Sequence, residues 1–166
     1  MTNKLERITT EYVDLEDRVR LTGEIGNDEH EVIWLTQRLI RRLVAELVEW
    51  LERCDDDAMH AEALHDFAQQ AAWAAMTPQA PIRPGDTCRT WLARSIEMAS
   101  SDQIVQLTFK GPDDQGASLT LNDRSLRQWL NVLQGTYIKA GWSLDGWPDW
   151  IRDGIRPVHS PVAVLH

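Results

Sequence analysis

Two segments of the sequence resemble each other when they are aligned 86 positions apart, Val19–Leu47 on Val105–Leu133, without a gap. Positions that carry identical residues in both segments include Val19, Leu21, Thr22, Asp28, Leu35, Arg38 and Arg41. These matches share one register and one order of structural signals, so we interpret them as an internal duplication. A duplication constrains the fold because both halves must then adopt the same local structure.

Each half begins with three short stretches that are typical of β-strands, rich in Val, Thr, Leu and aromatic residues and bounded by acidic or glycine-containing turns. In the first half the predicted strands are 9–15, 19–25 and 31–35, and in the second half they are 91–99, 104–109 and 117–121. The alternating patterns predict half-buried hairpins, and therefore mainly antiparallel pairing.

A helix follows the third strand in each half. Thr36 and Asn122 occupy equivalent positions, and both residue types are good N-caps. From Gln37 to about Arg53, apolar residues recur on one broad face, which predicts a helix packed against a sheet. The second helix is predicted to end near Ala140, with Gly141 as its C-terminal stop.

A further helix is predicted between the two halves, at about 56–76. Its apolar side holds a histidine and several alanines, and these small residues predict close packing against another element: His60, Ala63, Leu64, Phe67, Ala71 and Ala74. We expect His60 to be a core residue. The stretch 77–86 contains three prolines and is predicted to be an extended linker.

Together these patterns predict an α+β fold. We expect one domain over residues 1–166, in which two β-β-β-α units are related by a pseudo-twofold axis. The expected parts are a first unit at 8–53, the helix and linker at 54–89, a second unit at 90–141 and a tryptophan-rich tail at 142–166.

Net charge and apolar run lengths limit the classes of partner. The 17 basic and 26 acidic residues give a formal charge of −9, which disfavours nucleic acids because these are bound through basic surfaces. No apolar run approaches the ~20 residues of a membrane span. We expect a cytoplasmic protein whose two cysteines, Cys54 and Cys88, are reduced thiols.

Four arginines are the candidate ligand-binding residues. Arg38 and Arg41 match Arg124 and Arg127, and all four fall in the first two turns of the predicted helices. Cations are mildly unfavourable near a helix N-terminus. Their repetition is explained either by an anion site or by inheritance from a duplicated ancestor, with the arginines paired to loop acids such as Asp28 and Asp114.

The tail carries the other candidate surface. Trp142, Trp147 and Trp150 lie close together in a segment with Gly, Pro and Asp. Such a cluster either forms an interaction surface or folds back over the core. The final apolar residues, 162–165, could add a β-strand to this chain's own sheet or to a partner's.

No nucleophile elbow, phosphate-binding loop or metal-ligand spacing is present in the sequence. We therefore expect no catalytic residues, no metal and no cofactor, and lean towards a non-catalytic interaction or accessory factor. Its expected partner is a second copy or another protein, with neither nucleic acid nor a membrane as a partner. The alternative is a binding domain or enzyme for a small anionic ligand held by the four arginines.

Overall fold

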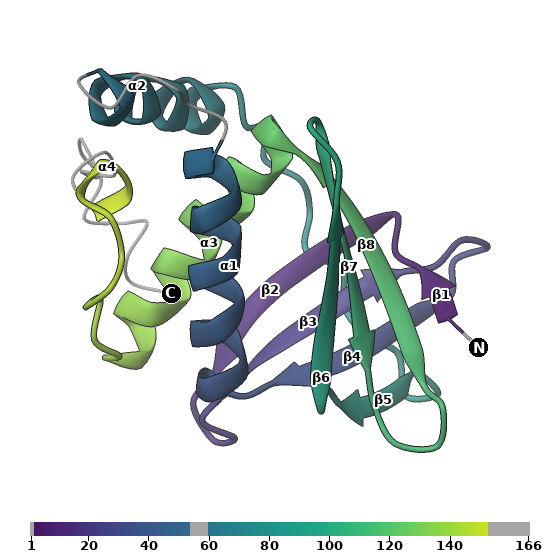
Figure 1. Cartoon of the computed structure of the whole chain (residues 1–166). Coiled ribbons are helices and arrows are strands. Elements are labelled where there is room, and N and C mark those ends of the chain that lie inside the picture. Colours follow the sequence, from purple (N-terminus) through teal and green to yellow (C-terminus); the bar gives the residue numbers. More distant parts are fainter. Residues whose placement is uncertain (1, 54–59, 153–166) are drawn as a thin grey trace.

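The computed structural model describes residues 2–53 and 60–152 of the chain. Within these ranges the protein is α+β, with two four-stranded sheets and four helices (Figure 1). The first sheet has the order β2 (Arg7–Val13), β3 (Arg18–Glu24), β4 (His30–Leu35), β5 (Arg89–Leu92). The second has the order β1 (Thr2–Lys4), β8 (Gly116–Asn122), β7 (Ile104–Lys110), β6 (Ser95–Ser100). The helices are α1 (Gln37–Arg53), α2 (Ala61–Ala74), α3 (Asp123–Ala140) and α4 (Asp149–Arg152).

The predicted order of three strands followed by a helix is confirmed in both halves, as β2-β3-β4-α1 and β6-β7-β8-α3. The helix ends also agree with the sequence. The Thr36 hydroxyl accepts a hydrogen bond from the backbone N–H of Leu39 at 3.3 Å. Asn122 and Ser125 form a reciprocal capping box at the start of α3, and Gly141 ends this helix in the left-handed conformation, with φ 73°.

The hairpin turns between β3 and β4 and between β7 and β8 have the same left-handed conformation at their two central residues. Asn27 and Asp28 have φ values of 51° and 60°, and Asp113 and Asp114 have 55° and 59°. Positive φ at two successive residues is the requirement of a type I′ turn, and Asn and Asp tolerate it better than other side chains. These residues therefore set the register of both hairpins.

The predicted strand at 91–99 is wrong, because the chain changes sheets within it. The backbone N–H of Ala93 bonds to the backbone oxygen of Trp34 in β4 of the first sheet, and the N–H of Arg94 bonds to that of Lys110 in the second. Two strands, β5 and β6, therefore replace the single one. The same change occurs near the N-terminus, where Leu5 bonds to Ser118 and Glu6 to Glu24.

Each sheet is consequently mixed. Within each half, neighbouring strands pair antiparallel, but β5 pairs parallel with β4 and β1 pairs parallel with β8. The sequence did not predict β1, which is only three residues long. Both added strands come from the segment that precedes the other half of the chain, so the two halves are interlocked at their edges.

The main core lies between the inner faces of the two sheets and helices α1 and α3 (Figure 1). The broad apolar face predicted for α1 is buried there, including Ile40, Leu47 and Leu51. The linker between α2 and β5 crosses the outer face of the first sheet. Its Ile82 is buried, and the backbone N–H of Ile82 bonds to the Thr9 hydroxyl at 2.9 Å. Thr22, which pairs with Thr9, is also buried.

A buried carboxylate connects the two sheets. Glu31 of β4 is 0% exposed. One of its oxygens accepts a hydrogen bond from Nε1 of Trp91 in β5 at 2.7 Å, and the other accepts one from Nδ2 of Asn3 in β1 at 3.3 Å. Arg89 lies 3.8 Å from the same carboxylate. Glu31 therefore contacts both of the strands that interlock the halves.

The structure predicts that Glu31→Ala lowers the free energy of unfolding by about 3 kcal/mol, because it leaves the buried Trp91 indole and the Asn3 amide without their acceptor. Urea unfolding followed by circular dichroism measures the change. The control is Glu97→Ala, which removes an exposed carboxylate that pairs with Lys110 at 2.7 Å. It is expected to cost less than about 1 kcal/mol. Equal losses for the two variants would contradict the role assigned to Glu31.

Candidate functional site

Helix α2 packs on the protein with the side that the sequence marks as polar. His65, Gln69 and Ala72 are its buried residues, and they face α3 and α4. The expectation that His60 and the apolar side are buried is therefore wrong: His60, Leu64 and Phe67 are exposed. Partners on the neighbouring helices explain this orientation, since α3 offers hydrogen-bonding groups where α2 meets it.

Gln69 forms the centre of the contact between α2 and α3. Its Nε2 donates to the backbone oxygen of Arg127 and to Oδ1 of Asn131, both at 2.8 Å. From the other helix, Nε2 of Gln128 donates to the backbone oxygen of Ala72 at 2.9 Å. These hydrogen bonds place α2 in one register on α3, because a shift of one residue would leave the buried amides unpaired.

Arg127 joins three helices at the end of this contact. Its guanidinium group lies 3.1 Å from the Asp123 carboxylate and 3.0 Å from Nδ1 of His65. Because arginine only donates hydrogen bonds, Nδ1 of His65 is the acceptor. The Trp150 ring stacks on His65 with centroids 4.7 Å apart, and the Arg127 guanidinium lies 5.4 Å from the Trp150 centroid.

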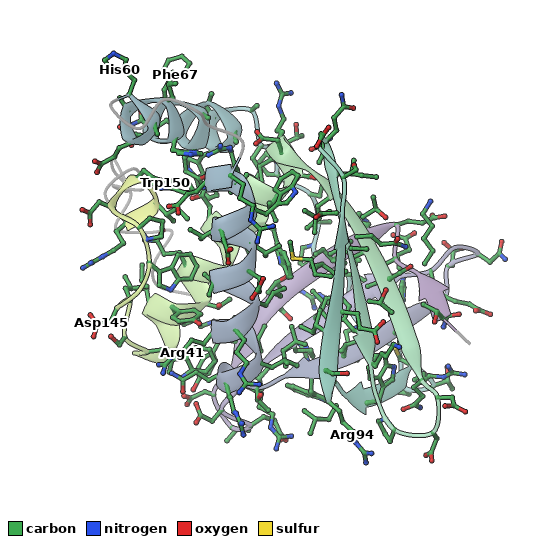
Figure 2. All side chains as sticks on the ribbon, in the orientation of Figure 1. Arg41, His60, Phe67, Arg94, Asp145 and Trp150 are labelled. Atoms are coloured by element: carbon green, nitrogen blue, oxygen red, sulfur yellow. The ribbon has the colours of Figure 1, made fainter. Side chains whose placement is uncertain are left out.

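The opposite side of α2 is an exposed apolar surface. Phe67 is 74% exposed and Leu64 is 53% exposed, and both lie on a side that otherwise carries alanines and His60. Figure 2 shows His60 and Phe67 projecting from α2 away from the rest of the chain, with Trp150 on the side beneath the helix. We call this surface the outward face and define it by its residues: His60, Ala63, Leu64, Phe67, Ala71 and Ala74.

The structure does not bring the four candidate arginines together. Arg38, Arg41 and Arg124 are exposed, and Arg127 is buried. Arg41 lies near the hydroxyl of Tyr137: burial raises the pKa of Tyr137, and the charge of Arg41 partly offsets that rise. Arg127 is paired with Asp123 on its own helix rather than with a loop acid. The equivalent residues Arg41 and Arg127 therefore differ in burial, whereas Arg38 and Arg124 are both exposed.

The tail tryptophans pack against the chain itself. Trp147 and Trp150 are both 5% exposed and belong to the main core. Trp142 and Trp147 make edge-to-face contacts with Tyr137, with ring centroids 5.2 and 5.1 Å apart. This part of the tail therefore covers one end of α3. The apolar residues 162–165, suggested as an added strand, lie outside the described residues.

The surface has one hollow lined by both polar and apolar side chains and another beside Glu31. One, of about 530 Å³, lies between β2, the start of the linker and α3, and Trp129 is part of its wall. The other, of about 640 Å³, lies beside Glu31 and contains Cys88. Burial raises the pKa of the Cys88 thiol, and the charge of Glu31 raises it further. The thiol is therefore a poor nucleophile near neutral pH.

Among residues 2–53 and 60–152, no group of three or more His, Cys, Asp or Glu side chains is arranged to hold a metal ion. No helix in the described part of the chain has the length and apolarity of a membrane span. Neither a family model, a curated protein nor a solved structure matches the sequence.

Sequence reasoning missed His65, Gln69 and Asn131, which carry the polar contact beneath α2. A signal for them exists in the sequence, since His65, Gln69 and Ala72 recur at helical spacing along the side opposite the apolar stripe. A polar stripe normally faces water. Only the position of α3 reverses that expectation.

We predict that Arg127→Met lowers the free energy of unfolding by about 2 kcal/mol, because the buried His65 ring and the exposed Asp123 carboxylate both lose a charged donor. Arg124→Met is the matched control, one turn earlier on α3 and exposed, and its expected effect is within about 0.5 kcal/mol. Thermal and urea unfolding measure both variants. A similar loss for both would show that the Arg127 contacts contribute nothing specific.

For Cys88 we predict slow alkylation. In a Cys54→Ser background, iodoacetamide at pH 8 should modify folded protein more slowly than urea-unfolded protein, because burial keeps more of the thiol protonated. Mass spectrometry over time gives both rates. Alkylation of the folded protein at a rate equal to or above that of the unfolded protein would contradict this prediction.

Proposed function

We propose that this chain is a non-catalytic accessory factor that binds another polypeptide, and that the outward face of α2 is the surface that binds. The partner chemistry that fits this face is an apolar helix. The observation that supports the proposal is the orientation of α2: its polar side, with Gln69, is buried, and its apolar side, with Phe67 and Leu64, is exposed. Exposed apolar residues that lie together mark interaction sites more often than single ones do.

The free-energy cost of burying the polar side of α2 rather than its apolar side supports the proposal. Burial of Phe67 or Leu64 would contribute roughly 1.5–3 kcal/mol each. In the isolated chain that contribution is not realised, while the polar side of the same helix must be desolvated and paired. An apolar partner would supply the missing burial without disturbing the polar contact on the other side.

We also propose that the scaffold arose by duplication of a strand-rich unit. The offset of 86 positions makes Asn3 equivalent to Arg89 and Glu31 equivalent to Ala117. In support of a duplication, the two parallel strand pairs join equivalent positions, since Asn3 pairs with Ala117 and Arg89 pairs with Glu31. The β3–β4 and β7–β8 hairpins keep the same relation, since Val19 pairs with Leu35 and Val105 with Leu121.

The outer hairpins depart from this relation. Glu24 is equivalent to Lys110. Because Glu24 pairs with Arg7, the offset of 86 would pair Lys110 with position 93, but Lys110 pairs with Ser95 instead. The second unit therefore changes sheets two residues later. This proposal implies that a pseudo-twofold axis relates the two units and that the whole chain forms one domain.

Helix α2 and the tail with α4 lie outside the proposed repeat. They also contact each other, through the stack of His65 on Trp150. If the duplicated units form the scaffold, these two segments are the additions specific to this protein. This argument favours α2 over the repeated arginines, which lie within the scaffold and do not converge.

Site-specific photo-crosslinking tests the proposal. Phe67→p-benzoylphenylalanine, in the full chain and in the cells that naturally make it, should yield one defined polypeptide adduct, which mass spectrometry identifies. Leu15→p-benzoylphenylalanine is the control, because Leu15 is an exposed apolar residue (97%) in the turn between β2 and β3. Absence of any adduct at position 67, or the same adducts at both positions, would refute the proposal.

A further inference from the structure

The outward face of α2 repeats with the spacing of a coiled-coil seam. Its central residues are His60, Leu64, Phe67, Ala71 and Ala74, separated by four, three, four and three positions. In a heptad repeat these are alternating a and d positions, the residues that contact another helix. The described neighbours of α2, on α3 and α4, contact its other side, so this seam is not used within the described part of the chain.

Resting on the proposed function, we infer that the occupant of the outward face is a second copy of this chain, with the two α2 helices antiparallel about a twofold axis. The first argument is size. The large residues of the seam, Leu64 and Phe67, lie in its N-terminal half, whereas Ala71 and Ala74 lie in its C-terminal half.

An antiparallel pair combines these halves. Each a position then meets a d position. With the axis midway between Phe67 and Ala71, Phe67 packs against Ala71 of the partner subunit and Leu64 against Ala74 of the partner subunit. Each layer formed by these four residues therefore holds one large and one small side chain, at one even spacing between the helices. A parallel pair would instead place Phe67 on itself and Ala71 on itself, which leaves the two ends unequally filled.

Charge gives the second argument. The positions that flank the seam carry no charged residue: Ala61, Ala63, Ala68, Gln70 and Ala75. Two copies of a chain with a formal charge of −9 can therefore meet along α2 without facing acids in the contact. The nearest acids, Glu62 and Asp66, lie in the N-terminal half. The antiparallel arrangement places them opposite the uncharged C-terminal half of the other helix, whereas a parallel one would place them opposite themselves.

The helix is short, so the dimer is expected to depend on concentration. Fourteen residues at ~1.5 Å each give a seam of about 21 Å. Such a contact falls at the small end of specific interfaces, which are weak and transient. Sedimentation velocity of the full chain between low and high micromolar concentration should show a shift from monomer to dimer. Phe67→Glu should weaken dimerisation roughly 100-fold or more, because each dimer carries the substitution twice.

Cysteine crosslinking tests the arrangement, in a background with Cys54→Ser and Cys88→Ser. Leu64→Cys and Ala74→Cys proteins, mixed and oxidised, should form a disulfide-linked heterodimer, while neither protein alone should link to itself efficiently. Leu15→Cys serves as the control for random collision. Circular dichroism confirms that each variant is folded.

Three results would overturn the inference. Efficient self-linking of Leu64→Cys would show a parallel pair, and heterodimer no faster than the Leu15→Cys control would show no pairing along the seam. A wild-type chain that stays monomeric at all concentrations would exclude the second copy. If the wild-type chain stays monomeric, a photo-adduct at position 67 with a different polypeptide would leave the proposed function intact. The absence of any adduct would refute both the proposed function and the second copy as its partner.

Discussion

The architecture depends on one constraint, the exchange of edge strands between the two sheets. At Leu5–Glu6 and at Ala93–Arg94 the backbone passes from one sheet to the other between adjacent residues. There is no loop at either point to absorb a change in the relative position of the sheets. The sheets can therefore move past each other only if β1 or β5 gives up its backbone hydrogen bonds.

Glu31 lies where this constraint is strongest. Its carboxylate receives hydrogen bonds from Asn3 and Trp91, one from each exchanged strand. A buried charge is costly unless it is paired, so a shift of either exchanged strand would leave the Glu31 carboxylate with fewer hydrogen bonds. The Trp91 ring also fills the space over Gly111, where a Cβ would lie only 2.4 Å from the ring. Side-chain packing and hydrogen bonding therefore agree on one placement of β5.

Helix α2 shows how a rigid scaffold can support an unusual surface. Because α1 and α3 already cover the open side of the sheets, α2 packs on the helix layer rather than on the core between the sheets (Figure 1). The side of α3 that meets it offers Asn131, Gln128 and the backbone oxygen of Arg127. Polar contact thus decides which side of α2 is buried, and the apolar side with Leu64 and Phe67 is exposed.

Local patterns in the sequence determined much of this protein by themselves. The three-strand-and-helix order of both halves, the caps at Thr36 and Asn122 and the stop at Gly141 all follow from short-range chemistry, which acts within a few residues. Tertiary structure decided the rest: the split of 91–99 into β5 and β6, the added strand β1, the burial of Arg127 but not Arg124, and the side of α2 that faces outward. Each of these depends on a neighbour that is distant in sequence. Periodicity shows that a helix has two unlike sides, but the surroundings determine which of them meets water.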